Sequence, residues 1–331
     1  MCDEVFLLYT FPEHLVQEDP MGLVNGREIL EAAHQGGYAV GAFNISNLEI
    51  LQGVVAGCVE AQSPLIIAAT EGAIQYAGFE YIVAMVRVAA ALTSIPMALH
   101  LDHGRDHTII DQCIRGGFTS VMIDASHLPL EENIKETRRV VAMAHNEGVS
   151  VEAELGRLQG VEDLVSVQDR EATFTDPGEA VRFVEETGVD SLAPAIGTSH
   201  GAFKFKGEAA LDLERLKNIK ERVGIPLVLH GASTVPQHLI QLVMHYGGEL
   251  KEAKGVPPDQ LQKAITLGIN KINTDTDLRL ALTGAVRRVL TEDRRVFDPR
   301  KILGPARDMI SEVVKEKVRL FGSAGKAQEA R

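Results

Sequence analysis

Short apolar runs alternate with longer stretches of helical periodicity along most of the chain. The apolar runs are rich in Val, Ile, Leu and Ala and are bounded by turn-forming residues, which is typical of buried strands. The stretches between them, such as Leu130–Asn146 and Pro177–Thr187, end at or near a glycine, as helices commonly do. Eight strands are predicted: Ala39–Asn44, Pro64–Thr70, Met97–His103, Ser120–Ala125, Ser150–Leu155, Ser191–Gly197, Pro226–Gly231 and Lys271–Asp275.

This succession of strands and helices predicts an α/β fold of the (β/α)8 TIM barrel type, which takes about 250 residues. A doubly wound sheet is the alternative, but it needs no eighth unit, and no G-x-G-x-x-G motif opens a helix here. Pro194 counts against the sixth strand, because proline cannot donate a hydrogen bond to a neighbouring strand.

Additional helices are predicted after the barrel. Asp298-Pro299 begins a further helical region that runs to about Leu320, and Phe321–Arg331 is predicted to be a frayed tail. The sequence contains no low-complexity segment and no sign of a domain boundary. We therefore expect one barrel domain with a C-terminal helical region from about residue 298.

Composition narrows the class of protein. The chain has 331 residues and a formal net charge of −13, which argues against non-specific binding of nucleic acid. No apolar run approaches the ~18 residues that a membrane span needs. The three cysteines are too scattered for a disulfide framework or a cysteine-based zinc site, so a reducing, cytoplasmic setting is predicted.

Reactive side chains stand where the predicted strands end, and in a barrel these carboxyl ends form the face that carries active sites. His103, His200 and His230 follow the third, sixth and seventh strands. Three neutral imidazoles with an open position describe a catalytic zinc site. His107, four residues after His103, is the main competing ligand, and Asp102 is a candidate proton-transfer group.

Two further carboxylates, Asp124 and Glu154, end the fourth and fifth strands. They are interpreted either as an alternative metal position or as internal salt bridges of the barrel mouth, and the residues alone leave both open. His100 and His127 lie close to the predicted ligands in the sequence, where they could orient those ligands through hydrogen bonds.

Glycine-rich turns predict an anion site. In Gly201 and Gly231-Ala232-Ser233, small residues let backbone N–H groups close on a phosphate, and Lys204 adds positive charge. Hydrogen-bonding groups follow at the end of the last strand, with an arginine one helical turn later: Asn273, Thr274, Asp275, Thr276 and Arg279.

These blocks together resemble the class II, metal-dependent fructose-bisphosphate aldolases, in particular the shorter second subgroup that also holds the tagatose-bisphosphate enzymes. The resemblance runs from about Gly22 to Phe321, so residues 1–20 are expected to be an extension ahead of a single barrel domain of residues 21–331. The matching blocks are Gly41–Asn44, Leu99–Gly104, Ser120–His127, Glu152–Gly156, Gly197–Gly201, Leu229–Ser233 and Ile272–Arg279.

The resemblance implies a role for each of these residues. Asp102 would be the proton donor to the aldehyde oxygen in the condensation direction, and Glu162 would move the C3 proton from a loop after the fifth strand. Zinc would be bound by His103, His200 and His230, and a second metal position would lie at Asp124 and Glu154. The substrate would be bound by Asn44, Thr70, Gly201, Lys204, Gly231, Ala232, Ser233, Asn273, Thr274, Asp275, Thr276 and Arg279. Within that set, Thr70 and Asp275 would face the glyceraldehyde half, and the family often has serine at the position of Thr70.

The implied reaction is reversible cleavage of fructose 1,6-bisphosphate to dihydroxyacetone phosphate and glyceraldehyde 3-phosphate, in glycolysis or gluconeogenesis. Such cleavage leaves an enediolate, whose charge either a lysine imine or a Lewis-acid metal can stabilise. Lys271 begins the last predicted strand, at the wrong end for an imine, so zinc is favoured. The resemblance leaves open a second divalent ion and a monovalent cation.

Three alternatives remain. Tagatose 1,6-bisphosphate is the competing substrate, although Asp275 is typical of the fructose enzymes. A metal-dependent hydrolase on the same barrel would carry His-x-His at the end of the first strand, where this chain has Phe43-Asn44. A non-catalytic phosphosugar-binding barrel would be expected to lose Asp102 or Glu162.

Arg300, in Asp298-Pro299-Arg300, links the predicted site to assembly. From the sequence alone, a solvated arginine at the start of a helix is the simpler interpretation. In the resembling enzymes this arginine reaches into a neighbouring subunit's site, which implies a homodimer or homotetramer whose Arg300 binds the distal phosphate. The expected partners are therefore a phosphosugar and further copies of the chain, without nucleic acid or membrane.

Overall fold

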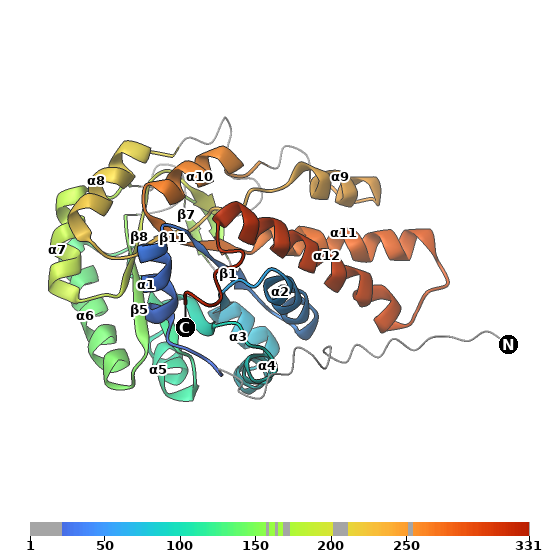
Figure 1. Ribbon diagram of the computed structural model, residues 1–331, viewed down its shortest axis with the longest axis horizontal. Helices are drawn as coiled ribbons and strands as arrows, with labels where there is room; N and C mark the ends of the chain where they lie inside the picture. The colour runs from blue at the N-terminus through green and yellow to red at the C-terminus, as the bar shows by residue number, and fades with distance from the viewer. Residues whose placement is uncertain are drawn as a thin grey trace.

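The computed structural model describes residues 22–156, 159–162, 165–167, 173–200, 211–250 and 254–330. Eight parallel strands close into a barrel with the neighbour order β1-β11-β10-β8-β5-β4-β3-β2, and helices surround it (Figure 1). The predicted TIM barrel is confirmed. Its strands are β1 (Val40–Asn44), β2 (Leu65–Thr70), β3 (Met97–Gly104), β4 (Ser120–Ile123), β5 (Ser150–Leu155), β8 (Ser191–Pro194), β10 (Leu227–Leu229) and β11 (Ile269–Thr274).

The helices follow the strands as the periodicity predicts, with two of them, α6 and α7, at the predicted bounds. Asparagine, threonine or aspartate side chains cap many helix starts; Asn25 Oδ1, for example, accepts a hydrogen bond from the Arg27 N–H. The helices are α1 (Gly26–Gly36), α2 (Leu48–Glu60), α3 (Glu71–Ala77), α4 (Phe79–Ala91), α5 (His107–Gly116), α6 (Leu130–Asn146), α7 (Pro177–Thr187), α8 (Leu213–Val223), α9 (Gln237–His245), α10 (Pro258–Thr266), α11 (Thr276–Glu292) and α12 (Pro299–Phe321). None of the described helices is long and apolar enough to span a membrane.

Two strands differ from their predicted bounds. Strand β8 ends at Pro194, because a proline inside the strand would leave a neighbouring carbonyl without its donor. Strand β11 begins at Ile269, so Lys271 lies within the strand rather than at its start, and its side chain is buried. The interpretation of Lys271 as a residue of the strand's N-terminal end was therefore wrong.

The barrel interior changes from apolar to polar along its axis. Val40, Ala42, Ile66 and Ala98 form a small apolar cluster with one face of α1. The backbone ahead of α1 bonds to Met97, the first residue of β3, so this helix covers the N-terminal ends of the strands. Because the bottom is closed by apolar side chains, the polar side chains of the interior gather toward the opposite, C-terminal face.

A small sheet that the sequence did not predict lies beyond β5 and β8. Strand β6 (Gln159–Glu162) pairs antiparallel with β7 (Val165–Val167) and parallel with β9 (Ser199–His200). The register places Gly160 opposite His200. The segments that carry the predicted base Glu162 and the predicted ligand His200 therefore belong to one sheet.

The last helices extend the fold beyond the barrel. Helices α11 and α12 run side by side and project away from the strands, and α12 returns to pack along α2 (Figure 1). Gly53 and Gly57 of α2 face α12 so closely that a Cβ on Gly57 would lie 2.7 Å from the backbone oxygen of Ser311. Glycine at these two positions therefore permits the close approach of the two helices.

The predicted frayed tail is wrong up to residue 330. The N–H groups of Gly325 and Ala327 donate hydrogen bonds to the carbonyls of Ala61 and Gln62, and Ala327 is buried. Ser63 Oγ donates to Ser323 Oγ over 2.9 Å. The residues after α12 thus dock against the turn between α2 and β2, a contact that local sequence periodicity cannot reveal.

The glycine contact between α2 and α12 generates a stability prediction. Gly57→Ala is expected to lower the free energy of unfolding by about 1–3 kcal/mol, because the added methyl group must push the two backbones apart. This loss should outweigh the higher helix propensity of alanine. Denaturant unfolding of both proteins measures the difference.

Ala56→Ser is the matched control, since it adds one heavy atom at the neighbouring, exposed position of the same helix. It is expected to change the free energy of unfolding by less than about 0.7 kcal/mol. Equal effects of the two substitutions would contradict the close packing of α2 against α12.

Candidate active site

The predicted metal residues that the structure describes converge at the C-terminal mouth of the barrel. Potential ligand atoms of Asp102, His103 and His230 lie within 4.8 Å of one another, and the same holds for His103, Asp124 and Glu154. The rings of His103 and His230 stand edge to face with centroids 4.5 Å apart. Side chains from strands β3 and β5 and from the residues directly after β4 and β10 therefore meet at one point.

His103 reaches this point through an unusual backbone conformation. Side chains alternate between the two faces of a strand, so Asp102 and His103 would normally point in opposite directions. His103 instead has a φ of 50°, in the left-handed region that residues other than glycine seldom adopt. The register between β3 and β4 shifts between Leu101 and Gly104. This irregularity brings both neighbouring side chains to the mouth.

His230 is oriented by a carboxylate beneath it. Its Nε2 lies 2.7 Å from Glu152 Oε1, and Glu152 Oε2 lies 2.7 Å from Lys271 Nζ. Burial tends to raise the pKa of Glu152, but the Lys271 ammonium and the hydrogen bond with His230 outweigh it and hold that pKa well below its usual range. Because a carboxylate only accepts, His230 Nε2 carries the proton and Nδ1 offers its lone pair.

The same reasoning applies to His103. Its Nδ1 lies 3.3 Å from Asp124 Oδ2, which also accepts from Arg105 Nε over 2.9 Å. Burial tends to raise the pKa of Asp124, yet hydrogen bonding to His103 and the Arg105 charge hold it well below its usual range. Asp124 is therefore an acceptor that leaves Nε2 of His103 as the nitrogen able to bind a metal.

Both interpretations of the carboxylates thus have a counterpart in the structure. Asp124 forms an internal salt bridge with Arg105 and also accepts from Ser126 Oγ over 2.7 Å. Asp124 also lies close to His103 and to the buried Glu154, and these three residues form a group that could hold a second ion.

Lys271 and His100 complete a buried network below the mouth. Lys271 Nζ lies 3.1 Å from His100 Nε2, and His100 Nδ1 lies 2.8 Å from Ser120 Oγ. Burial and the nearby Lys271 charge lower the pKa of His100 to about 3, so this imidazole is neutral. An imine at Lys271 would remove the charge that Glu152 faces, which agrees with the preference for metal chemistry.

Asp102 is fully buried and is fixed by two amides. Asn44 Nδ2 donates to its Oδ2 and Asn273 Nδ2 to its Oδ1, each over 2.8 Å, from the ends of β1 and β11. Among the described residues, several buried polar atoms at or after the ends of β1, β8 and β11 have no hydrogen-bond partner, which is rare in native structures. These atoms are Asn44 Oδ1, Asn273 Oδ1, Thr274 Oγ1 and Thr198 Oγ1.

The described part of the turn predicted to bind an anion directly follows His230, whose Nδ1 lies 3.9 Å from Asp102 Oδ1. Gly231 has a φ of 60°, and Ala232 and Ser233 are buried in the turn after β10. Thr276 begins α11, whose N-terminal dipole favours an anion. Thr70, at the end of β2, is largely buried and its Oγ1 accepts from the Ala73 N–H, so this hydroxyl also caps α3.

The two predicted arginines lie in exposed positions. Arg279 of α11 pairs over 2.8 Å with Asp275, the residue directly before that helix. Arg300 pairs with Asp298 at the start of α12, and its side chain is 82% exposed. That end of α12 belongs to the pair of helices that projects away from the barrel (Figure 1). Within its own chain, Arg300 thus stands apart from the mouth.

Several predicted residues lie outside the described part of the structure. Gly201 and Lys204 fall between residues 200 and 211, and the side chains of His200 and Glu162 are not described. The competing ligand His107 is described, and it lies on α5 with Nε2 3.0 Å from Glu136. It does not belong to either group of potential ligands among the described residues.

Sequence reasoning missed the residues that support the site, notably Glu152, Lys271 and Arg105. A usable signal was present for two of them, because Glu152 and Lys271 are charged residues inside otherwise buried strands. Charges there must find partners in the barrel interior. Glu152 also precedes Glu154 by two positions, which places both on the inner face of β5.

Comparisons with known proteins identify the family. The family model described as "Fructose-bisphosphate aldolase class-II" matches residues 24–326. The fructose-bisphosphate aldolase of Helicobacter pylori strain J99 is 54% identical over 305 residues, which cover 92% of this chain and 99% of that protein. That of Thermus caldophilus is 52% identical over 305 residues, covering 92% of this chain and all of that protein.

A solved structure gives the same result for the fold. The crystal structure of the YdjI aldolase from Escherichia coli K12 superposes with a TM-score of 0.76 at 35% sequence identity. The match covers 92% of this chain and 99% of that chain. With a family model that spans almost the whole barrel and relatives above 50% identity, this chain belongs to the class II fructose-bisphosphate aldolase family.

Proposed function

We propose that this chain catalyses the reversible aldol cleavage of fructose 1,6-bisphosphate to dihydroxyacetone phosphate and glyceraldehyde 3-phosphate. The observation that carries the proposal is a buried carboxylate, Asp102, held by two amides beside two histidines that belong with it to one group of potential metal ligands. A glycine turn suited to a phosphate lies at the same mouth. Family membership supports the same reaction.

The proposed metal is zinc, bound by His103 through Nε2, by His230 through Nδ1 and by His200. The donor set suits it, because neutral imidazoles are common zinc ligands and each described imidazole has a carboxylate behind it. A divalent ion at this position supplies Lewis-acid stabilisation of the negative charge that develops on the substrate's carbonyl oxygen. Asp124 and Glu154 are proposed as a second cation position.

Asp102 is proposed to move the proton of the C4 hydroxyl. In cleavage its carboxylate removes that proton as the C3–C4 bond breaks, and in condensation it returns the proton to the aldehyde oxygen. The amides of Asn44 and Asn273 fix the carboxylate at one orientation, and their oxygens can accept from substrate hydroxyls. Glu162 is proposed to add and remove the proton at C3.

Different residues of the mouth are proposed to bind the two halves of the substrate. Backbone N–H groups of Gly231, Ala232 and Ser233, with Gly201 and Lys204, would bind the phosphate of the dihydroxyacetone half. Thr70 and Asp275 would face the glyceraldehyde half, where fructose and tagatose bisphosphates differ in configuration at C4. Tagatose 1,6-bisphosphate is the alternative substrate.

Assembly is proposed to complete the site. Arg279, which was predicted to bind the substrate, pairs with Asp275 of its own chain. Arg300 stands on projecting helices with its guanidinium exposed, a position from which it can enter the mouth of a neighbouring copy. We therefore propose at least a homodimer, and retain the prediction of a cytoplasmic enzyme.

The first prediction concerns metal and substrate. The purified protein should cleave fructose 1,6-bisphosphate in preference to tagatose 1,6-bisphosphate, lose this activity after treatment with a chelator, and regain it with Zn²⁺. His230→Ala should fail to retain zinc, because two histidines do not fix such a site. Coupled assays and elemental analysis measure both effects. Full activity in a metal-free sample would contradict the proposal.

The second prediction separates proton transfer from metal binding. Asp102→Asn should retain the metal content of the wild type and lose roughly 10²–10⁴ in kcat, because an amide cannot accept the hydroxyl proton. Metal analysis of the same sample is the control. A variant that lost zinc in proportion to its activity would identify Asp102 as a ligand instead.

The third prediction concerns the shared site. Arg300→Ala should raise KM for the bisphosphate while leaving zinc content and the melting temperature near those of the wild type, because the side chain lies in solvent in a single chain. Co-expression of Arg300→Ala with Asp102→Asn chains should restore activity at low substrate concentration, since one site of each hybrid has both groups. A monomeric protein, or hybrids as inactive as the parents, would show that the site is not shared.

A further inference from the structure

The turn that follows the glycine site has a strained backbone. Val235 has a φ of 49°, which is unfavourable for a β-branched side chain because its two γ-carbons crowd the backbone. Val235 comes two residues after Ser233, so its conformation sets the path of the chain directly after the proposed phosphate-binding residues. Such a conformation persists only where the surrounding structure enforces it.

A buried carboxylate from α11 enforces it from one side. Asp277 is fully buried and accepts hydrogen bonds from the N–H groups of Thr234 over 3.1 Å and of Val235 over 2.9 Å. It also accepts from Thr234 Oγ1 over 3.2 Å. One side chain therefore fixes two successive N–H groups of the strained turn.

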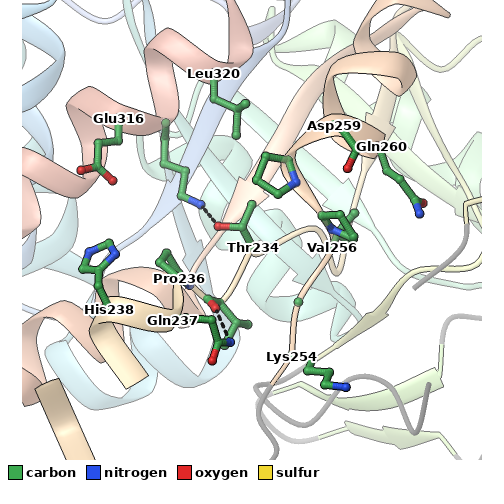
Figure 2. A pocket seen from close by; sticks show the side chains of 15 residues that line it. Thr234, Pro236, Gln237, His238, Lys254, Val256, Asp259, Gln260, Glu316 and Leu320 are labelled. Carbon is green, nitrogen blue, oxygen red and sulfur yellow. Dashed lines mark hydrogen bonds between the residues drawn. The ribbon is translucent and has the colours of Figure 1, made fainter. Parts of the chain in front are cut away.

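The charge of Asp277 is balanced by the C-terminal helix. Lys317 of α12 pairs with Asp277 Oδ2, and its Nζ donates to Thr234 Oγ1 over 2.5 Å, the contact drawn as a dashed line at Thr234 in Figure 2. Only 5% of the Lys317 side chain is exposed. Because an isolated carboxylate is strongly disfavoured in a buried position, the conformation of the turn depends on this lysine.

A second contact braces the turn from the direction of α10. The N–H of Val256 donates to the Ser233 carbonyl over 3.1 Å, and a Cβ on Gly255 would overlap the carbonyl groups of Ser233 and Thr234. Between this brace and α12 lies a cavity of about 820 Å³, lined by Thr234, Val235 and Lys317 among others (Figure 2). Because side chains do not fill this space, the turn is held on this side mainly by its hydrogen bonds to Asp277, Lys317 and Val256.

From this geometry we propose that Lys317 is a positioning residue for substrate binding, acting through Asp277 on the turn Thr234–Val235. The ion pair holds the N–H groups of Gly231, Ala232 and Ser233 in the orientation that binds the phosphate of the dihydroxyacetone half. This inference rests on the proposed function, which places a phosphate at that turn. It makes α12, remote in sequence from the strands' catalytic residues, a determinant of substrate affinity.

The test compares two lysines of the same helix. Lys317→Met removes the charge beside Asp277, whereas Lys315→Met removes a comparably buried lysine that pairs with Glu60 and Glu312 instead. Lys317→Met should raise KM for fructose 1,6-bisphosphate and weaken inhibition by inorganic phosphate by about tenfold or more, since small misplacements of binding groups have effects of this order or larger. Its kcat and zinc content should change much less, and Lys315→Met should leave KM and phosphate inhibition unchanged.

Two further variants keep the test decisive. Lys317→Arg retains the charge, and the adjoining cavity has room for the larger head, so it should restore KM. If Lys317→Met does not fold, Thr234→Val carries the test, because it removes the hydroxyl between Lys317 and Asp277 and should raise KM without loss of zinc. Equal KM and phosphate inhibition for wild type, Lys317→Met and Thr234→Val would overturn the inference. A wild-type protein that neither cleaves the bisphosphate nor binds phosphate would instead overturn the proposed function.

Discussion

The buried ion pair between Lys271 and Glu152 is the interaction on which the site depends most. Two opposite charges inside the barrel are costly to desolvate, and each is tolerable only with its partner in place. The pair keeps Glu152 ionised, the ionised carboxylate sets the tautomer of His230, and the tautomer decides which ring nitrogen faces the mouth. The charge of Lys271, in the middle of β11, thereby determines which ring nitrogen His230, the residue after β10, presents to the mouth.

The mouth combines this electrostatic control with local backbone strain. His103 and Val235 both adopt positive φ values although neither is glycine, and both adjoin groups with a proposed role in the reaction. Asp277 of α11 accepts from the N–H of Val235 and so holds that backbone, whereas Asp124, the residue after β4, lies against the imidazole of His103. Strain of this kind costs of order 1–3 kcal/mol per residue, and the surrounding contacts must offset it.

The sequence predicted the barrel and most of the described mouth, because parallel strands covered on both faces are near-continuous apolar runs whose ends can be read directly. Asp102, His103 and His230 were predicted from those ends, and the structure brings them together. The supporting residues were not predicted, since Glu152 and Lys271 are 119 positions apart and neither shows its partner locally. The prediction for the tail was wrong for the same reason, because the N–H groups of Gly325 and Ala327 bond to the carbonyls of Ala61 and Gln62, which are far away in the sequence.

The packing of α12 on α2, which Gly53 and Gly57 permit, has a consequence for how the protein is made. The strands appear in the chain before α12, so the barrel can begin to close during synthesis while Asp277 still lacks its cation. Domains emerge from the ribosome at about 5–20 residues per second, so this interval lasts on the order of seconds. By the proposed role of Lys317, a nascent barrel at this stage would have its strands but no fixed turn after β10. The ability to bind the phosphate of the substrate would then arise only once α12, which follows all eight strands in the chain, has packed.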